Sequence, residues 1–263
     1  VHSRGLNNIL SFESATPYDN WELWRDIRTL PLEEQKARLG DPATKAKLVE
    51  IANRKYTGPR IVGAEIRPPD WHYVFPMVDM SYDTPSMAQI AKEKGVDPVE
   101  LMIDMALERD LKMFFRAPIA NENQDHVLEM IKHPRSVVTF SDSGAHVSQI
   151  MDSSLQTHLL SHWVREKEAL TLEEAVKQIT YNTATLWGLH DRGLLREGMA
   201  ADVVVFDPDT IGPNMPEVLN DLPAGARRLK QTASGILNTV VNGEILLTDN
   251  EYSGATAGRL LRS

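Results

Sequence analysis

The residues best suited to chemistry lie in one short segment past the middle of the chain. Asp142 directly follows an apolar run, 136–140, and Gly144 and His146 come soon after it. A carboxylate at the end of a buried strand can exchange protons with a substrate or touch a metal ion. His146 could bind the substrate or orient Asp142. The same aspartate could equally start a turn or cap the next helix, and a loop histidine could equally be exposed.

The other histidines give a weaker indication of a metal site. His158 and His162 are four residues apart on a predicted helix, so they share one face of it. This spacing can bind zinc, but the glutamate that accompanies it in zinc proteases is missing between them. A structural role is therefore favoured for the pair. His2 is the only histidine near the start, and a lone histidine is usually structural.

Alternating strands and helices must position these residues. Strand patterns are predicted at 6–12, 61–66, 112–115 and 136–140. Helix patterns are predicted at 31–38, 42–54, 86–94, 97–106, 125–131 and 171–179. Gly95 is suited to end a helix, and Thr171 with Glu174 can form a capping box. This alternation is typical of a parallel sheet.

The last part of the chain has strand patterns and turn signals in place of alternating strands and helices. Strand patterns are predicted at 201–206, 236–241 and 244–248, and Asn242-Gly243 predicts a tight hairpin between the last two. The sequence therefore predicts a small β-rich domain that begins near residue 193. Trp163 and Trp187 are predicted to lie in the core.

Composition excludes several classes of function. The chain has 263 residues and a net charge of −9, which makes nucleic acid a poor partner. It contains no apolar run of about eighteen residues, so no membrane span is expected. It has no cysteine, so thiolate catalysis is excluded and any metal must be held by histidine, carboxylate or a modified lysine. This composition fits a cytoplasmic protein.

Several runs in the second half resemble the D-aminoacylase (N-acyl-D-amino-acid deacylase) branch of the amidohydrolase superfamily. The runs are SDSGAHVSQIMDSS at 141–154, TYNTATLWGLHDRGLLREGMAADVVVFDP at 180–208, DLPAGARRL at 221–229, TVVNGEILL at 239–247 and EYSGATAGRLLR at 251–262. The resemblance implies a mixed α/β fold, a (β/α)8 TIM-like barrel with a small β-sandwich. Residues 1–193 would be the C-terminal part of the barrel, and 194–263 would be the C-terminal segment of the sandwich.

The same resemblance implies a metal-dependent hydrolysis. One or two divalent metal ions, usually zinc, would activate water, and Asp142 would take the water proton, donate one to the leaving amine and touch the metal. His146 would contact the substrate, a small N-acyl amino acid that is often of D configuration.

The sequence departs from the family in one respect, because it contains no His-x-His pair. Most metal ligands are therefore expected outside this chain. Because the chain begins with Val1 and residues 1–12 resemble the middle of a domain, a fragment or processed chain is expected. An N-terminal portion or a separate chain would supply the rest. A homo-oligomer is a further expectation.

Three alternatives remain open at this stage. One is a cyclic amidase of the dihydropyrimidinase or hydantoinase kind. A second is a non-catalytic fragment or assembly subunit, which the missing ligands motivate. The third is an α/β binding domain without chemistry.

Overall fold

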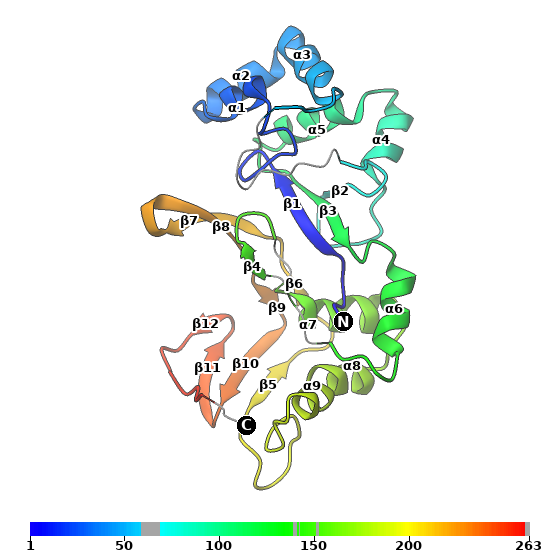
Figure 1. Cartoon of the computed structure of the whole chain (residues 1–263). Coiled ribbons are helices and arrows are strands. Elements are labelled where there is room, and N and C mark those ends of the chain that lie inside the picture. Colours follow the sequence, from blue (N-terminus) through cyan, green and yellow to red (C-terminus); the bar gives the residue numbers. More distant parts are fainter. Residues whose placement is uncertain (59–68, 139–140, 142, 151–152, 261–263) are drawn as a thin grey trace.

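The chain forms an elongated mixed α/β molecule with helices at one end and a small sheet at the other (Figure 1). The computed structural model describes residues 1–58, 69–138, 141, 143–150 and 153–260. None of the helices in this part of the chain is long and apolar enough to cross a membrane. The predicted strand at 61–66 and Asp142 lie outside the described residues.

A three-stranded sheet occupies the middle of the molecule. Its strands are β1 (Leu6–Ser11), β2 (Phe75–Met77) and β3 (Phe114–Ala120), in the order β1-β3-β2. Both pairings are antiparallel, so the parallel sheet that we predicted is wrong for these strands. The helices that lie between β1 and β3 in the sequence connect these two antiparallel strands.

A helical layer covers one end of this sheet (Figure 1). It contains α1 (Glu22–Arg28), α2 (Leu32–Gly40), α3 (Pro42–Ala52), α4 (Met87–Lys94) and α5 (Pro98–Leu107). The side chains of Asp41, Ser86 and Asp97 accept hydrogen bonds at the starts of α3, α4 and α5. Gly95 ends α4 with φ +68°, as predicted. Buried residues of these helices pack on Leu10 and Phe115 of the sheet.

A second group of helices lies on the other side of the sheet. Its elements are α6 (Gln124–Lys132), the short strand β4 (Ser143–His146), α7 (Leu155–His158), the π-helix Leu159–Glu166, α8 (Leu172–Ile179) and α9 (Tyr181–Leu186). Thr171 and Glu174 form the predicted capping box of α8. Leu159, Trp163 and Ala175 belong to a separate apolar core.

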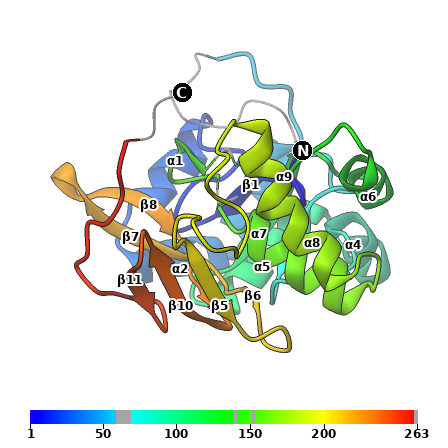
Figure 2. The same cartoon turned by 90° about the horizontal axis from the view of Figure 1, so that it is seen from below.

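The described elements that follow are strands and one short 3-10 turn, Pro223–Gly225. The strands are β5 (Val203–Phe206), β6 (Gly212–Pro213), β7 (Glu217–Leu222), β8 (Ala226–Lys230), β9 (Ala233–Ser234), β10 (Ile236–Val241), β11 (Glu244–Thr248) and β12 (Glu251–Tyr252). An antiparallel sheet has the order β12-β11-β10-β5, and Asn242 and Gly243 make its predicted hairpin with positive φ. Figure 2 shows this sheet beside α8 and α9.

Two predicted strands differ from the observed ones. Residues 136–138 form no strand, and 139–140 lie outside the described residues. The carbonyl of Val138 accepts a hydrogen bond from the Thr183 hydroxyl instead of a neighbouring strand. The strand predicted at 112–115 begins at Phe114 and continues to Ala120.

Candidate functional site

The two residues of the predicted catalytic loop have different outcomes. Asp142 lies outside the described residues, so its catalytic and metal-binding roles stay predictions. His146 is exposed at the end of β4 and has φ +48°. Its carbonyl oxygen accepts hydrogen bonds from the amides of Gln149 and Ile150, at 2.7 and 3.0 Å, which close a turn.

His158 and His162 lie together in the interior. They are 2% and 3% exposed, and their rings stack with centroids 4.8 Å apart. The Tyr82 ring contacts both, at 4.9 and 5.4 Å between centroids. Nδ1 of His162 is 3.1 Å from a carboxylate oxygen of Glu166 one turn later. The sequence therefore predicted the shared face correctly, while the tyrosine comes from a distant loop.

Two buried arginines lie close to this histidine pair. Arg116 on β3 is 4% exposed, and its guanidinium lies 3.6 Å from the Tyr82 ring centroid and 5.1 Å from that of Phe75. Arg4 is fully buried and donates a hydrogen bond to the Ser154 hydroxyl. His2 is also buried, and its Nδ1 lies 2.9 Å from the carbonyl oxygen of Arg4. These cations and imidazoles make the interior polar at this point.

The histidines are held in their neutral form. Burial lowers the pKa of His158 well below its ordinary value of about 6.5, and the positive charges of Arg4 and Arg116 lower it further. Burial also lowers the pKa of His162, although Glu166 opposes this effect. Both imidazoles are therefore uncharged at neutral pH and can donate or accept hydrogen bonds.

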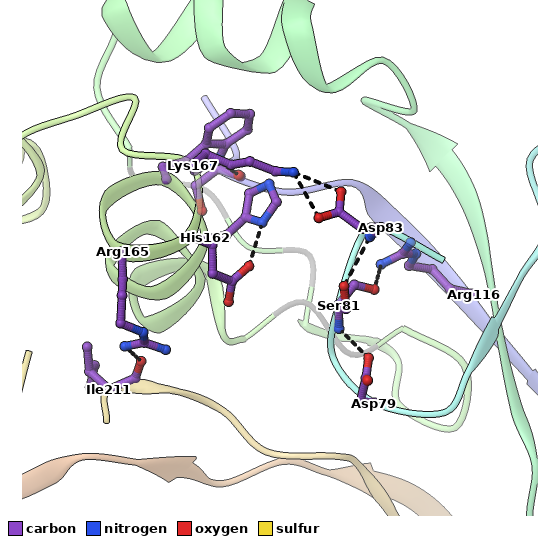
Figure 3. Close-up of polar contacts among 11 residues, drawn as sticks. Asp79, Ser81, Asp83, Arg116, His162, Arg165, Lys167 and Ile211 are labelled. Carbon is purple, nitrogen blue, oxygen red and sulfur yellow. Dashed lines mark hydrogen bonds and ion pairs between the residues drawn. The ribbon is translucent and has the colours of Figure 1, made fainter. Parts of the chain in front are cut away.

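Polar contacts of Asp79, Ser81 and Asp83 hold the loop between β2 and α4 (Figure 3), and Tyr82 belongs to this loop. Lys167, which follows the π-helix, contacts both carboxylate oxygens of Asp83 at 2.8 and 3.0 Å. The Ser81 hydroxyl accepts from the amide of Asp83, and the Asp79 carboxylate accepts from the amide of Ser81. These contacts tie the loop to the helix that carries His162.

The described residues do not make a metal centre. Within them, no three His, Asp or Glu side chains are grouped so that they could hold a metal ion. His158 and His162 lie beside Arg4 and Arg116, whose positive charges would repel a second cation. The cluster therefore suits an anion better than a metal ion.

Arg4, Tyr82 and Arg116 were missed in the sequence. An available indication was an arginine inside an apolar strand, Met113-Phe114-Phe115-Arg116, because a buried charge has to be compensated. Tyr82 carried no comparable indication. Arg192, which the sequence places beside Asp191, pairs with Asp202 and Asn242 in a structural contact.

Comparison with known proteins identifies the family. Residues 76–247, about two thirds of the chain, match the model of the amidohydrolase family, so the chain belongs to that family. It is 35% identical over 103 residues to a D-aminoacylase from Alcaligenes xylosoxydans xylosoxydans, covering 39% of this chain and 19% of the relative. It is 54% identical over 55 residues to an N-acyl-D-glutamate deacylase from the same organism, covering 21% of this chain and 11% of the relative.

A solved structure of a D-aminoacylase, described for the role of its binuclear metal centre, is also similar. Its sequence identity to this chain is 24% and the TM-score is 0.45, and the match covers 72% of this chain and 38% of that one. The matched regions thus span a fifth or less of the two curated relatives and about two fifths of the solved chain.

Proposed function

We propose that the complete protein is a metal-dependent amidohydrolase that cleaves the amide C–N bond of N-acyl-D-amino acids. The observation that carries the proposal is the family match over residues 76–247, together with relatives named as a D-aminoacylase and an N-acyl-D-glutamate deacylase. The bound metal would be one or two divalent ions, with zinc expected. Most of their ligands would lie outside this chain.

Asp142 is the proposed proton-transfer residue. In an amide hydrolysis a carboxylate can take the proton of the attacking water and return one to the leaving amine, which lowers the barrier to both steps. His146 is the proposed substrate contact, and its exposure leaves its ring accessible to a ligand. Residues 1–193 would form part of a barrel, and 194–263 would form part of a sandwich.

The role of Asp142 is tested by the substitution Asp142→Asn in the full-length protein. We expect turnover of an N-acetyl-D-amino acid to fall at least about a hundredfold. The asparagine side chain cannot take the proton of the attacking water or donate one to the leaving amine. Asp207→Asn is a matched control, since Asp207 also comes directly after an apolar run in the sequence but accepts hydrogen bonds from Asp209 and Thr210 in a turn. Turnover that survives Asp142→Asn, in a protein that is otherwise active, would remove Asp142 from the mechanism.

Metal dependence and substrate class are tested on the same preparation. We expect a chelator to abolish turnover and added zinc to restore it, because a metal-bound water is the expected nucleophile. The assay compares the two enantiomers of an N-acetyl-amino acid with a dihydropyrimidine. Hydrolysis of the cyclic compound alone would favour the cyclic amidase, and absence of any turnover with zinc present would favour a non-catalytic protein.

A further inference from the structure

Arg116 is a buried cation with little to compensate its charge. Its guanidinium is packed against the rings of Phe75 and Tyr82. Its Nη1 donates a hydrogen bond to the carbonyl oxygen of Ser81 at a long 3.4 Å, and its side chain also interacts with the Tyr82 hydroxyl. Among the residues that the structure describes, no carboxylate makes an ion pair with it. Burial lowers the pKa of Arg116, the Tyr82 side chain opposes this effect, and the charge of Arg4 adds to it.

Arg28, whose side chain is largely buried, shows what a compensated guanidinium needs. Arg28 pairs with Asp19 and also donates to the carbonyls of Phe12 and Ser14, at 2.9 and 3.0 Å. A buried charge without such partners is costly. A guanidinium stays charged even when its pKa is lowered, so Arg116 does not escape this cost by losing its proton. A group that is absent from the described chain could supply the missing negative charge.

Two further polar atoms beside Arg116 are buried within the described part of the chain. Nε2 of His158 has no hydrogen-bond partner there, and the phenol oxygen of Tyr82 has none other than the guanidinium itself. The Tyr82 ring lies between the two other groups, 3.6 Å from the guanidinium and 4.9 Å from the imidazole. A guanidinium, a phenol and a neutral imidazole can all donate hydrogen bonds to one acceptor.

The two nearest acidic groups that the structure describes on this loop and on the π-helix are already engaged. Asp83 is paired with Lys167, and the Glu166 carboxylate contacts Nδ1 of His162. The loop that carries Tyr82 is anchored by Asp83 and by Ser81. The three donors are therefore held in place before any ligand arrives, which lowers the entropic cost of binding.

We propose that Arg116, Tyr82 and His158 form a binding site for a carboxylate group of the ligand. A carboxylate matches the fork of a guanidinium and accepts up to four hydrogen bonds. The inference rests on the proposed function, because an N-acyl amino acid carries an α-carboxylate and an acidic one carries a second carboxylate on its side chain. Arg116 recognises one of these two groups.

Binding to the chelated, full-length protein tests the site without turnover. The probes are N-acetyl-D-alanine and its uncharged carboxamide, with affinities measured by calorimetry. N-acetyl-D-glutamate and N-acetyl-D-glutamine form the second pair. We expect the wild type to bind the carboxylate of at least one pair about tenfold or more tightly than its amide, because the guanidinium loses its charge partner with the amide.

Two substitutions of Arg116 separate recognition from structure. Arg116→Gln should remove the preference for the carboxylate, and Arg116→Lys should keep part of it. Arg165→Gln is the matched control, because Arg165 also donates to backbone carbonyls, those of Pro208 and Ile211. It should leave the preference unchanged. If Arg116→Gln loses the preference for the acid in the alanine pair, the site binds the α-carboxylate. If it loses the preference in the glutamate pair alone, the site binds the side-chain carboxylate.

Three results would overturn the site. They are a wild type without any preference for a carboxylate, an Arg116→Gln protein that keeps the preference, and an equal weakening of acid and amide. Failure of the proposed function is seen separately, since it appears as an absence of hydrolysis with zinc even when carboxylate binding depends on Arg116.

Discussion

Burial of His158 makes the folding stability of the protein depend on pH. Its folded pKa lies well below the value of about 6.5 in an unfolded chain, because burial disfavours the charged ring. The unfolded state therefore binds a proton below pH 6.5 while the folded state does not. Stability contributed by neutral His158 is fully present above this pH and decreases as the pH falls below it.

We expect protonation of His158 in the unfolded state to lower the unfolding free energy between pH 7.5 and pH 5, by at most about 2 kcal/mol for an unfolded pKa near 6.5. His158→Phe keeps a ring against Tyr82 and His162 but cannot bind a proton, so the unfolding free energy of this variant should fall less over that range. Denaturant unfolding of both proteins at the two pH values measures the difference. The exposed His126 on α6 provides the control. The unfolding free energy of His126→Ala should fall between the two pH values by as much as that of the wild type. Parallel losses in the wild type and His158→Phe would contradict the assignment.

For single residues, the sequence predicts which side chains share a face of one helix. It does not predict contacts between residues that are distant in the sequence. His158 and His162 share a face because helical spacing dictates it. The approach of Tyr82 and Arg116 depends on how β2 and β3 pair and on the ion pair between Asp83 and Lys167. None of these contacts is local, so no spacing in the sequence encodes them.

Helices were predictable at the scale of elements because their ends are chemically marked. Ser86 and Gln89 make a capping box, as do Thr171 and Glu174, and each satisfies backbone amides that the first helical turn leaves free. Strand partners were not predictable, since a strand pattern carries no direction. Trp187 was predicted in the core, which is wrong, because it is 67% exposed where α9 ends.

The turn before β10 depends on one glycine. Gly235 has φ +75°, and a Cβ atom there would lie 2.4 Å from the amide nitrogen of Ile211, a buried core residue. Gly235→Ala should therefore lower the unfolding free energy by about 3 kcal/mol, from backbone strain and from displacement of Ile211. Gly254 has φ +86° with open space around it, so Gly254→Ala should cost about 1 kcal/mol. Equal losses for the two variants in denaturant unfolding would show that strain alone decides.

At the scale of the molecule, the first residues join parts of the chain that are distant in sequence. The amino group of Val1 donates to Val137, and the Ser3 hydroxyl donates to Leu155. The Trp163 indole nitrogen donates to the carbonyl of Ser3 at 2.6 Å, across 160 residues. These contacts place the segment that carries His2 and Arg4 against the histidine pair. A sequence pattern cannot predict such contacts, although it did predict that Trp163 is buried.

Trp163 should therefore contribute far more stability than an exposed tryptophan. Trp163→Phe removes the only described donor to the carbonyl of Ser3 and leaves a void in a core where Trp163 is 4% exposed. We expect a loss of about 2–4 kcal/mol in denaturant unfolding, from the unpaired carbonyl and the void together. Trp187→Phe makes the same chemical change on the surface and should alter stability by less than about 0.5 kcal/mol. If the two variants were equally stable, the N-terminal segment would not be held by this core, and the position of Arg4 beside His158 would need another cause.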